Sequence, residues 1–359
     1  MIPRMANDGG RGATPEIRSM PKAELHRHIE GCVPARTIIR IARKHKLPLP
    51  TFDEAALDER VRLKAPMRSL QEVLTMFDIA QSVFVSLDAV EEIVQGMLER
   101  AYKDENIRLL EARYSPDFML KGKGLDWQEA FDRIHATISR FESEHSFCGG
   151  IILIVSRSYG LESAAKTVDF ALRNKGRVAG FDFADSESAF PPSLYRGLAG
   201  KLRDAGIPLT VHSGEDAGWQ AVLETIEFLK PRRIGHGVKA AEDPSGKTLE
   251  RIKSEGILIE TNPWSNYLTH AVGSIEKHPL PLFLKAGVKV SIGADDPDIL
   301  DTNLNKEYGL AVEKMGLSLE DLRRVNRNAV EASFLPEEKR QEAARLMGFK
   351  TLGLMDESR

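Results

Sequence analysis

The chain has 359 residues, of which 42% are apolar, and its formal charge at neutral pH is −3. This composition is typical of a globular protein with a large core, and it offers no basic excess for binding a nucleic-acid backbone. The two cysteines lie far apart and no apolar run approaches a membrane span, which argues against a disulfide framework and a membrane anchor. We therefore expect a cytoplasmic protein without nucleic-acid or membrane partners, although a nucleoside substrate is compatible with this composition.

The first residues are polar and rich in glycine, and they lack the apolar core of a signal peptide. We expect residues 1–18 to form a flexible extension. No internal repeat and no Pro-, Gly- or Ser-rich linker divides the rest, so residues 19–359 are expected to form a single domain.

The first predicted strand spans residues 23–31 and carries a His-x-His pair. Side chains alternate along a strand, so His26 and His28 point to the same side. Such a pair can bind a metal ion from one strand face, but alone it is a weak signal.

Two helical segments follow, over residues 34–46 and 68–99. In the second, Leu70, Val73, Leu74 and Phe77 share one face. A face of this kind usually packs into a core, and it can also cover a pocket.

Three further strands are predicted at residues 106–116, 150–156 and 178–183. The third strand is wholly apolar, as expected for a strand covered on both faces. In the second, Glu111 and Arg113 are expected to form an ion pair inside a barrel.

The fifth strand covers residues 206–211 and runs into His212, Gly214 and Glu215. Glycine permits a tight turn after the strand, which places the histidine close to the glutamate. A neutral imidazole can bind a metal and a nearby glutamate can carry a proton. A buried histidine followed by a helix-starting glutamate explains this stretch alone about equally well.

The last three strands are predicted at residues 233–237, 257–261 and 287–293. His236 lies at the end of the sixth strand, and Asp295 and Asp296 follow the eighth. Strands that alternate with helices form parallel sheets, and eight such units close into an α/β (β/α)₈ TIM barrel. The long connection between strands one and two has room for an inserted helical lid, and residues 319–347 are expected to add helices outside the barrel.

The carboxyl ends of barrel strands converge on one mouth, where His26, His28, His212, His236 and Asp295 would meet. Histidines and a carboxylate suit Zn²⁺ or a similar divalent ion. Five groups leave no open position on a four-coordinate ion, so one histidine is spare and is available to orient a nucleophile.

The chain resembles the adenosine/adenine deaminase family of the amidohydrolase superfamily over residues 21–336. The motifs that carry the resemblance are Pro-Lys-Ala-Glu-Leu-His-Arg-His-Ile-Glu-Gly (21–31), Arg-Tyr-Ser-Pro (113–116), Val-His-Ser-Gly-Glu (211–215), Arg-Ile-Gly-His-Gly (233–237), Asn-Pro-Trp-Ser-Asn (262–266), Asp-Asp-Pro (295–297) and Arg-Asn-Ala-Val-Glu-Ala-Ser-Phe (327–334).

The resemblance implies a role for each matching residue. One Zn²⁺ per chain would bind His26, His28, His212 and Asp295. Glu215 would be the proton shuttle and His236 would act on the hydroxide nucleophile. Asp296 would bond a purine nitrogen. Further candidate substrate contacts are Glu30, Asp185 and Gly214, together with the apolar lid of Leu70, Val73, Leu74 and Phe77.

The implied reaction is hydrolytic deamination, in which hydroxide attacks C6 of the purine while Glu215 protonates N1 and ammonia leaves. Asp296 must either donate to N7 in its protonated form or accept from a protonated N7, and the sequence leaves both options open.

Several residues depart from the family pattern. Glu30 stands where adenosine deaminases usually carry an aspartate that meets the ribose and adenine deaminases carry glutamate. Asp185 replaces a usual glycine, so its carboxylate either contacts the substrate or turns away to solvent or to the following helix. Gly235 is the adenosine-type residue, whereas Asn262 replaces a usual cysteine. Ser-Ile-Gly-Ala (291–294) replaces the commoner Ser-Leu-Asn-Thr. We expect deamination of adenosine to inosine, with free adenine or a modified adenine nucleoside such as aminodeoxyfutalosine as the alternative substrate.

Other functional classes fit less well. A cytidine-deaminase site needs a Pro-Cys-x-x-Cys signature, which the sequence lacks. A two-metal amidohydrolase usually has a lysine at the end of the fourth strand, where this chain has Asp182 and Phe183. A non-catalytic relative is expected to lose metal ligands or the glutamate, and here all are present.

Overall fold

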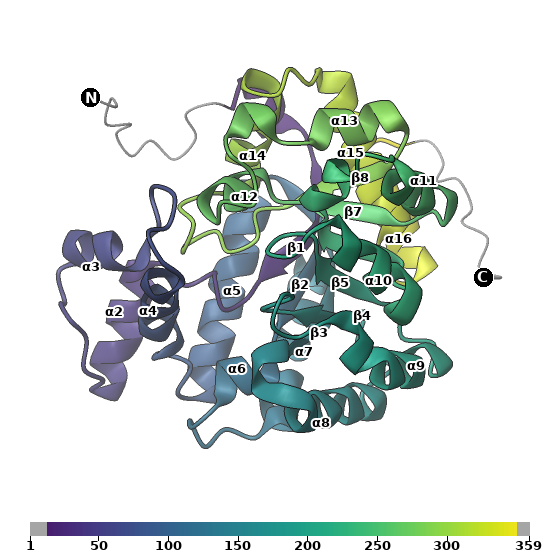
Figure 1. The fold of residues 1–359 in the computed structure, drawn as a ribbon. Coiled ribbons are helices and arrows are strands. Elements are labelled where there is room, and N and C mark those ends of the chain that lie inside the picture. The colour runs from purple at the N-terminus through teal and green to yellow at the C-terminus, as the bar shows by residue number, and fades with distance from the viewer. Residues whose placement is uncertain (1–12, 350–359) are drawn as a thin grey trace.

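The computed structural model describes residues 13–349, apart from the side chains of Leu70 and Gln71. Parallel strands curl into a barrel with helices around it, as Figure 1 shows. The strands of the described chain are β1 (Lys22–His28), β2 (Ile107–Tyr114), β3 (Cys148–Ser156), β4 (Gly180–Ala184), β5 (Thr210–Ser213), β6 (Arg233–His236), β7 (Leu258–Thr261) and β8 (Lys289–Ile292).

Backbone hydrogen bonds close the barrel at two seams. Strands β1 to β4 pair in parallel in chain order, and so do β5 to β8. The N–H of Phe181 donates to the carbonyl of Pro208 at 3.0 Å and joins the two halves. At the other seam Asp295 donates to the carbonyl of His26 at 3.0 Å, and His28 donates to the carbonyl of Asp295 at 2.9 Å. The expected (β/α)₈ barrel is confirmed, and this second seam runs through candidate metal ligands.

The fifth strand begins later in the structure than its apolar sequence predicts. The apolar run starts at residue 206, whereas β5 starts at Thr210. Gly206 has φ of +78°, which an extended strand does not use, and Pro208 has no N–H for the ladder. Gly206 and Pro208 therefore keep the start of the apolar run out of the strand, and β5 is short.

Helices cover the outside of the barrel in Figure 1. In the described chain they are α1 (Pro15–Ser19), α2 (Ala35–His45), α3 (Glu54–Val61), α4 (Leu70–Gln81), α5 (Leu87–Lys103), α6 (Pro116–Leu120), α7 (Trp127–Glu144), α8 (Gly160–Arg173), α9 (Arg196–Asp204), α10 (Trp219–Leu229), α11 (Lys247–Ser254), α12 (Pro263–Leu268), α13 (Leu280–Ala286), α14 (Leu304–Glu313), α15 (Leu319–Ala332) and α16 (Glu337–Leu346), with short 3₁₀ turns η1 (Arg157–Tyr159), η2 (Pro192–Tyr195), η3 (Val238–Glu242) and η4 (Ile275–Lys277) between them.

Helices α2 to α5 form the long insertion between β1 and β2. The sequence predicts a mostly helical stretch over residues 68–99, but the structure divides it into α4 and α5. The hydroxyl of Ser82 bonds the carbonyl of Ile79 at 2.7 Å at the end of α4. Ser86 then caps α5 by accepting from the N–H of Ala89 at 3.1 Å. Serine side chains compete for backbone groups in this way, which favours a break.

The start of the chain is folded earlier than the sequence suggests. Residues 1–12 lie outside the described part, but residues 15–18 of the expected flexible extension belong to helix α1. Thr14 caps this helix and Pro15 begins it, both of which favour a helix start. Ile17 is fully buried, so burial of this one side chain ties the segment to the domain.

Helices α15 and α16 lie outside the strands, as expected, while their connection reaches the interior of the barrel. Ser333 and the N–H of Phe334 both donate to Glu111 Oε1, at 2.6 and 2.5 Å. The side chain of Arg233 donates to the carbonyl of Ala332 at 3.1 Å. This connection therefore contacts charges inside the barrel from the end opposite the mouth.

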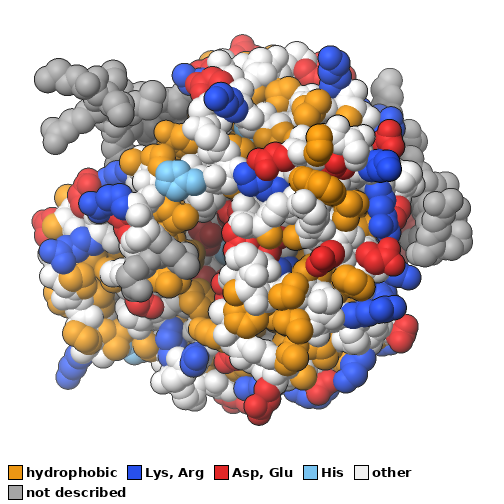
Figure 2. Space-filling model, in the orientation of Figure 1, with side chains coloured by type: hydrophobic (Ala, Val, Ile, Leu, Met, Phe, Trp, Pro, Cys, Tyr) orange, Lys and Arg blue, Asp and Glu red, His pale blue; other side chains and the backbone are white. Residues whose placement is uncertain are grey.

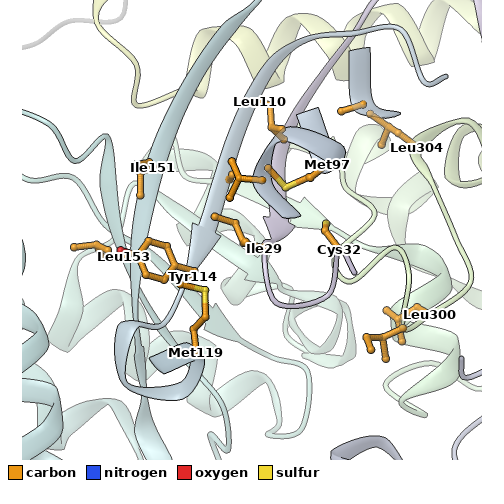
Figure 3. Packing of buried hydrophobic residues seen from close by; sticks show 14 of the residues in the cluster. Ile29, Cys32, Met97, Leu110, Tyr114, Met119, Ile151, Leu153, Leu300 and Leu304 are labelled. Atoms are coloured by element: carbon orange, nitrogen blue, oxygen red, sulfur yellow. The ribbon is translucent and has the colours of Figure 1, made fainter. Parts of the chain in front are cut away.

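The apolar core joins the strands to the surrounding helices. Figure 3 shows part of it, with Met97 of α5, Leu110 of β2 and Ile29 just after β1 in one buried cluster. Within residues 13–349, none of the helices is both long and apolar enough to cross a membrane.

Candidate metal centre and active site

Side chains from four strands meet at the carboxyl end of the barrel. His26 and His28 lie on β1, His212 lies on β5, His236 ends β6, and Asp295 follows β8. Ligand-type atoms of His26, His212, His236 and Asp295 all lie within 4.8 Å of one another. A second set that meets the same limit contains His28, Asp295 and Asp296. The structure thus brings together every candidate ligand that the sequence suggests.

The spacing within this cluster suits a small divalent ion. The Nε2 atoms of His26 and His28 are 3.4 Å apart, and each lies 3.3 Å from Asp295 Oδ1. The ring centroids of His26 and His212 are 4.7 Å apart. Ligands that bind zinc at about 2.0–2.2 Å stand roughly 3–4 Å from one another. The donor atoms are therefore already close to the separation that such an ion requires.

Carboxylates behind two of the histidines fix their orientation. His26 Nδ1 lies 2.7 Å from Glu260 Oε2, and His212 Nδ1 lies 3.0 Å from Asp182 Oδ2. A histidine that gives its Nδ1 proton to a carboxylate presents an unprotonated Nε2, which is the usual arrangement behind a metal ligand. This pattern is the observation that best matches the cluster to a bound metal.

Arginines hold these supporting carboxylates in place. Arg113 contacts Asp182 at 2.6 Å and Glu260 at 2.8 Å, while Arg233 contacts Glu260 at 2.7 Å and Glu111 at 2.7 Å. We call these five fully buried residues the interior ion-pair network. The expectation that Glu111 pairs with Arg113 is wrong, because each reaches across the barrel to another strand.

The backbone at two site residues adopts an uncommon conformation. His236 has φ of +62° and Asp295 has φ of +61°. Non-glycine residues rarely occupy this left-handed region, and such strain concentrates at functional sites. His236 is the last residue of β6, whereas Asp295 follows β8, and in both cases the side chain turns into the mouth.

Glu215 lies on a tight turn opposite the cluster. Gly214 has φ of +76°, and a Cβ at this position would come within 2.7 Å of Val222, so the turn requires glycine. Glu215 Oε2 lies 3.3 Å from His236 Nε2, and Thr269 donates to its other oxygen at 3.1 Å. Burial and the nearby charge of Asp295 raise the pKa of Glu215 to about 8. This carboxyl group can therefore hold a proton near neutral pH.

Glu187 supports this turn and was not recognised as functional from the sequence. Its carboxylate accepts from the backbone N–H groups of Gly214 at 2.7 Å, Glu215 at 2.9 Å and Asp216 at 3.3 Å. Three N–H groups bound by one buried carboxylate leave the turn little freedom, so Glu187 sets the position of Glu215.

Two carboxyl groups beside the cluster have unpartnered oxygens. Glu30 accepts from the N–H of Ser115 at 2.7 Å through Oε1, whereas its buried Oε2 has no hydrogen-bond partner among the described residues. Asp296 Oδ1 is also buried and has no hydrogen-bond partner among the described residues. Burial raises the pKa of Glu30 to about 8, and burial with the charges of Asp295 and Glu30 raises that of Asp296 well above its usual range.

The side chain of Asp185 is exposed and has partners of its own. Its carboxylate accepts from the hydroxyl of Ser158 and from the N–H of Ser186 at 2.8 Å. Its φ is +76°, so the backbone keeps a conformation that favours glycine even though the residue is aspartate. The structure therefore places this carboxylate against η1 at the rim.

The apolar residues proposed to cover the substrate lie on α4. Val73 and Phe77 are partly buried, and Leu74 is 41% exposed. Phe77 packs edge-on against Phe118 of α6 with ring centroids 5.9 Å apart. The side chain of Leu70 lies outside the described residues. Figure 2 shows the surface hollowed between α4 and the barrel, with acidic side chains inside the hollow.

The supporting residues were harder to find from sequence than the cluster itself. Glu260 interrupts an apolar strand, and a charged residue in such a strand is the signal that could have identified it. Asn266 Nδ2 lies 2.9 Å from His236 Nδ1; Asn266 belongs to the Asn-Pro-Trp-Ser-Asn motif, but the motif does not indicate that its last residue contacts His236.

Comparison with known sequences gives matches over most of the chain. A family model described as adenosine deaminase matches residues 21–347. The adenosine deaminase of Erwinia tasmaniensis is 32% identical over 321 residues, which cover 89% of this chain and 96% of the relative.

Two solved structures share the fold. The adenine deaminase from Arthrobacter aurescens has a TM-score of 0.84 at 23% identity, covering 92% of this chain and 98% of that one. An amidohydrolase from Burkholderia ambifaria with bound Zn has a TM-score of 0.80 at 22% identity, covering 95% of this chain and 93% of that one.

Proposed function

Because the chain belongs to the adenosine deaminase family, we propose that it binds one Zn²⁺ ion and converts adenosine to inosine and ammonia. The chain is a hydrolytic deaminase that acts on an adenine nucleoside or a close analogue. The metal, the exact substrate and the role of each residue are the proposal.

The proposed metal ligands are His26, His28, His212 and Asp295. The support is the pair of histidines whose Nδ1 atoms face Glu260 and Asp182 while their Nε2 atoms face the cluster. The Burkholderia structure with bound Zn has the same fold. When bound, Zn²⁺ would lower the pKa of a water molecule and supply a hydroxide nucleophile.

Glu215 would carry the proton to purine N1. Attack at C6 moves electrons onto N1, so a proton donor at that atom lowers the energy barrier of the reaction. The pKa of about 8 leaves much of this carboxyl group protonated at neutral pH. Its position is set by Glu187 and Thr269, which restrict the turn and the side chain.

Asp296 and Gly214 would contact the purine ring. The raised pKa of Asp296 favours its protonated form, in which it would donate a hydrogen bond to N7. Val73, Leu74 and Phe77, together with Leu70, would cover the ring as part of a lid formed by α4. Residues 19–359 would act as one catalytic domain, located in the cytoplasm.

Free adenine is the second candidate substrate, because Glu30 is the residue type that adenine deaminases usually carry at this position, and a modified nucleoside such as aminodeoxyfutalosine is the other alternative. The buried Oε2 of Glu30 has no partner among the described residues, and its raised pKa supplies a proton to donate. A buried polar group without a partner is costly, so a substrate atom is expected to pair with it. On adenosine that atom would be a ribose oxygen, and on adenine a ring nitrogen.

Ammonia release from adenosine, 2′-deoxyadenosine, adenine and aminodeoxyfutalosine, together with metal analysis, tests the proposal. The expected result is about one zinc per chain and the highest kcat/KM on adenosine. Activity that survives prolonged chelation would contradict the metal assignment. A higher kcat/KM on adenine would contradict the substrate and support the reading based on Glu30.

A further inference from the structure

The two nitrogens of His236 face opposite kinds of partner. Nε2 points to the mouth, 3.3 Å from Glu215 Oε2 and 3.9 Å from Asp295 Oδ2. Nδ1 points away from it and lies 2.9 Å from Asn266 Nδ2 and 3.3 Å from Asn262 Nδ2. The ring is buried, so these neighbours decide which nitrogen carries the proton.

A backbone group fixes the direction of the hydrogen bonds behind His236. The N–H of Leu280 can only donate, and it lies 3.2 Å from His278 Nδ1, which must therefore accept. His278 is fully surrounded by protein, and burial lowers its pKa to about 3, so it is neutral and carries its one proton on Nε2. That nitrogen donates to Asn266 Oδ1 at 3.1 Å.

The direction passes on through the amide of Asn266. Since Oδ1 accepts from His278, the amide nitrogen must be the group that faces His236 Nδ1. An amide nitrogen only donates, so His236 Nδ1 must accept and cannot carry a proton.

We propose that Leu280, His278 and Asn266 form a relay of fixed polarity that holds the proton of neutral His236 on Nε2, directed into the active site. Asn266 and His278 would then be positioning residues for deamination, acting through His236. The catalytic part of this inference rests on the proposed function, whereas the position of the proton does not.

A second amide, that of Asn262, lies beside the same nitrogen. Its Nδ2 is 3.3 Å from His236 Nδ1, whereas its Oδ1 faces Gly293 and has no hydrogen-bond partner among the described residues. A Cβ at position 293 would lie 2.6 Å from Asn262 Oδ1 and 2.9 Å from His26 Cβ, so glycine at 293 leaves room for this amide. No described partner fixes the direction of the Asn262 amide, and the tautomer of His236 therefore follows from Asn266, whose N–H group would oppose a proton on Nδ1.

The first test is the protonation of His236 in the zinc-loaded protein, read from its ring nitrogen signals by NMR. The signals are assigned by their absence in His236→Gln. The relay requires a protonated Nε2 and an unprotonated Nδ1. A proton found on Nδ1 of the unaltered chain would overturn the inference, whatever the substrate proves to be.

The second test inverts one link of the relay. In Asn266→Asp the carboxylate still accepts from His278, but it draws a proton to His236 Nδ1. We expect the NMR signature to change accordingly and kcat to fall by about a hundredfold or more, since a wrong tautomer severely impairs a catalytic histidine. KM and zinc content should change by less than about threefold. A kcat within about threefold of the unaltered chain would overturn the relay.

Two further comparisons separate positioning from folding. Asn305 is equally buried and donates to the carbonyl of Asp104 at 2.9 Å on α14, so Asn305→Asp should leave kcat and the His236 signals unchanged. His278→Gln keeps a donor for Asn266, whereas His278→Leu removes it. We expect the glutamine variant to retain about tenfold more kcat than the leucine variant, and equal losses would contradict the relay. If the unaltered chain releases no ammonia from any purine, the proposed function fails while the NMR result still decides the tautomer.

Discussion

The barrel holds two sets of buried charged side chains, one midway along the strands and one at the mouth. In the interior ion-pair network, each carboxylate has an oxygen within 2.7 Å of an arginine nitrogen, and Glu260 has a second arginine contact at 2.8 Å. At the mouth, Glu30, Glu215 and Asp296 lack an arginine or lysine partner among the ion pairs of the described residues.

The two sets differ in pKa for this reason. Burial would raise the pKa of Glu260, but Arg113 and Arg233 hold it well below its usual range. Burial raises the pKa of Glu30 and of Glu215 to about 8, and no arginine reverses the shift. Charges paired within the fold stabilise the barrel, whereas carboxyl groups without a direct arginine or lysine ion pair can exchange protons with a substrate.

The largest expected effect comes from the mouth. In Glu215→Gln, kcat should fall by about a thousandfold, because glutamine cannot carry a proton to the ring. The melting temperature should stay equal or rise, because a desolvated carboxyl group is removed. Glu224→Gln removes the same charge at an exposed position on α10, and it should leave kcat and the melting temperature unchanged. A Glu215→Gln variant with more than a tenth of the original kcat would remove the contrast between the two sets.

The next effect concerns the interior ion-pair network. Glu260→Gln should lower the free energy of unfolding by about 3 kcal/mol, because Arg113 and Arg233 lose a buried counter-charge. Urea unfolding of the metal-free protein measures this loss without a contribution from bound zinc. The exposed pair of Glu227 and Arg251 supplies the control, since Glu227→Gln should cost less than about 0.5 kcal/mol. Equal losses in the two variants would mean that burial adds nothing to the network.

A smaller effect should follow pH through His278. Burial lowers its pKa in the folded protein to about 3, whereas an unfolded histidine titrates near 6.5. Between these values the unfolded chain binds the extra proton, so stability falls as the solution is acidified. From pH 6 to pH 4 the unaltered chain should lose about 1.4 kcal/mol per pH unit more than His278→Gln. Unfolding curves for metal-free protein at each pH measure the difference, and parallel losses in both chains would exclude a neutral buried imidazole.

The smallest effect is expected at Asp185, a carboxylate at the rim that already has partners. Asp185→Gly should change stability by less than about 1 kcal/mol, because relief of the left-handed backbone offsets the entropy cost of glycine. The ratio of kcat/KM for adenosine and adenine should move by less than about threefold, since the carboxylate faces Ser158. A tenfold shift toward adenosine would instead show that Asp185 contacts the substrate and belongs with the mouth carboxylates.

The barrel and its mouth cluster were predictable because both depend on local patterns. His26 and His28 share a strand face by simple alternation, and the ends of parallel strands converge whatever lies between them. The break at Ser86 was missed because an apolar periodicity continues across it while side-chain capping decides the outcome. Helix α1 was missed because one buried side chain, Ile17, outweighs a polar and glycine-rich composition.

Partners across the barrel could not be predicted from local patterns. Glu111 and Arg113 face the same side of β2, but each forms its ion pairs with residues on other strands, and for Glu111 the partner is over a hundred positions away. Which strands face each other depends on how the barrel closes. The support of Glu215 by Glu187 and of His236 by Asn266 likewise joins separate loops. Such contacts follow from the assembled barrel, and sequence spacing carries no information on them.

The seam between β1 and the end of β8 has a consequence for synthesis of the protein. The candidate ligands His26 and His28 emerge from the ribosome early, whereas Asp295 emerges only after most of the chain has been made. The same residues exchange the two backbone hydrogen bonds that join the last strand to the first. A nascent chain shorter than 295 residues therefore lacks both the complete ligand set and the closed seam. Loading of the ion would then report that translation had reached the final strand.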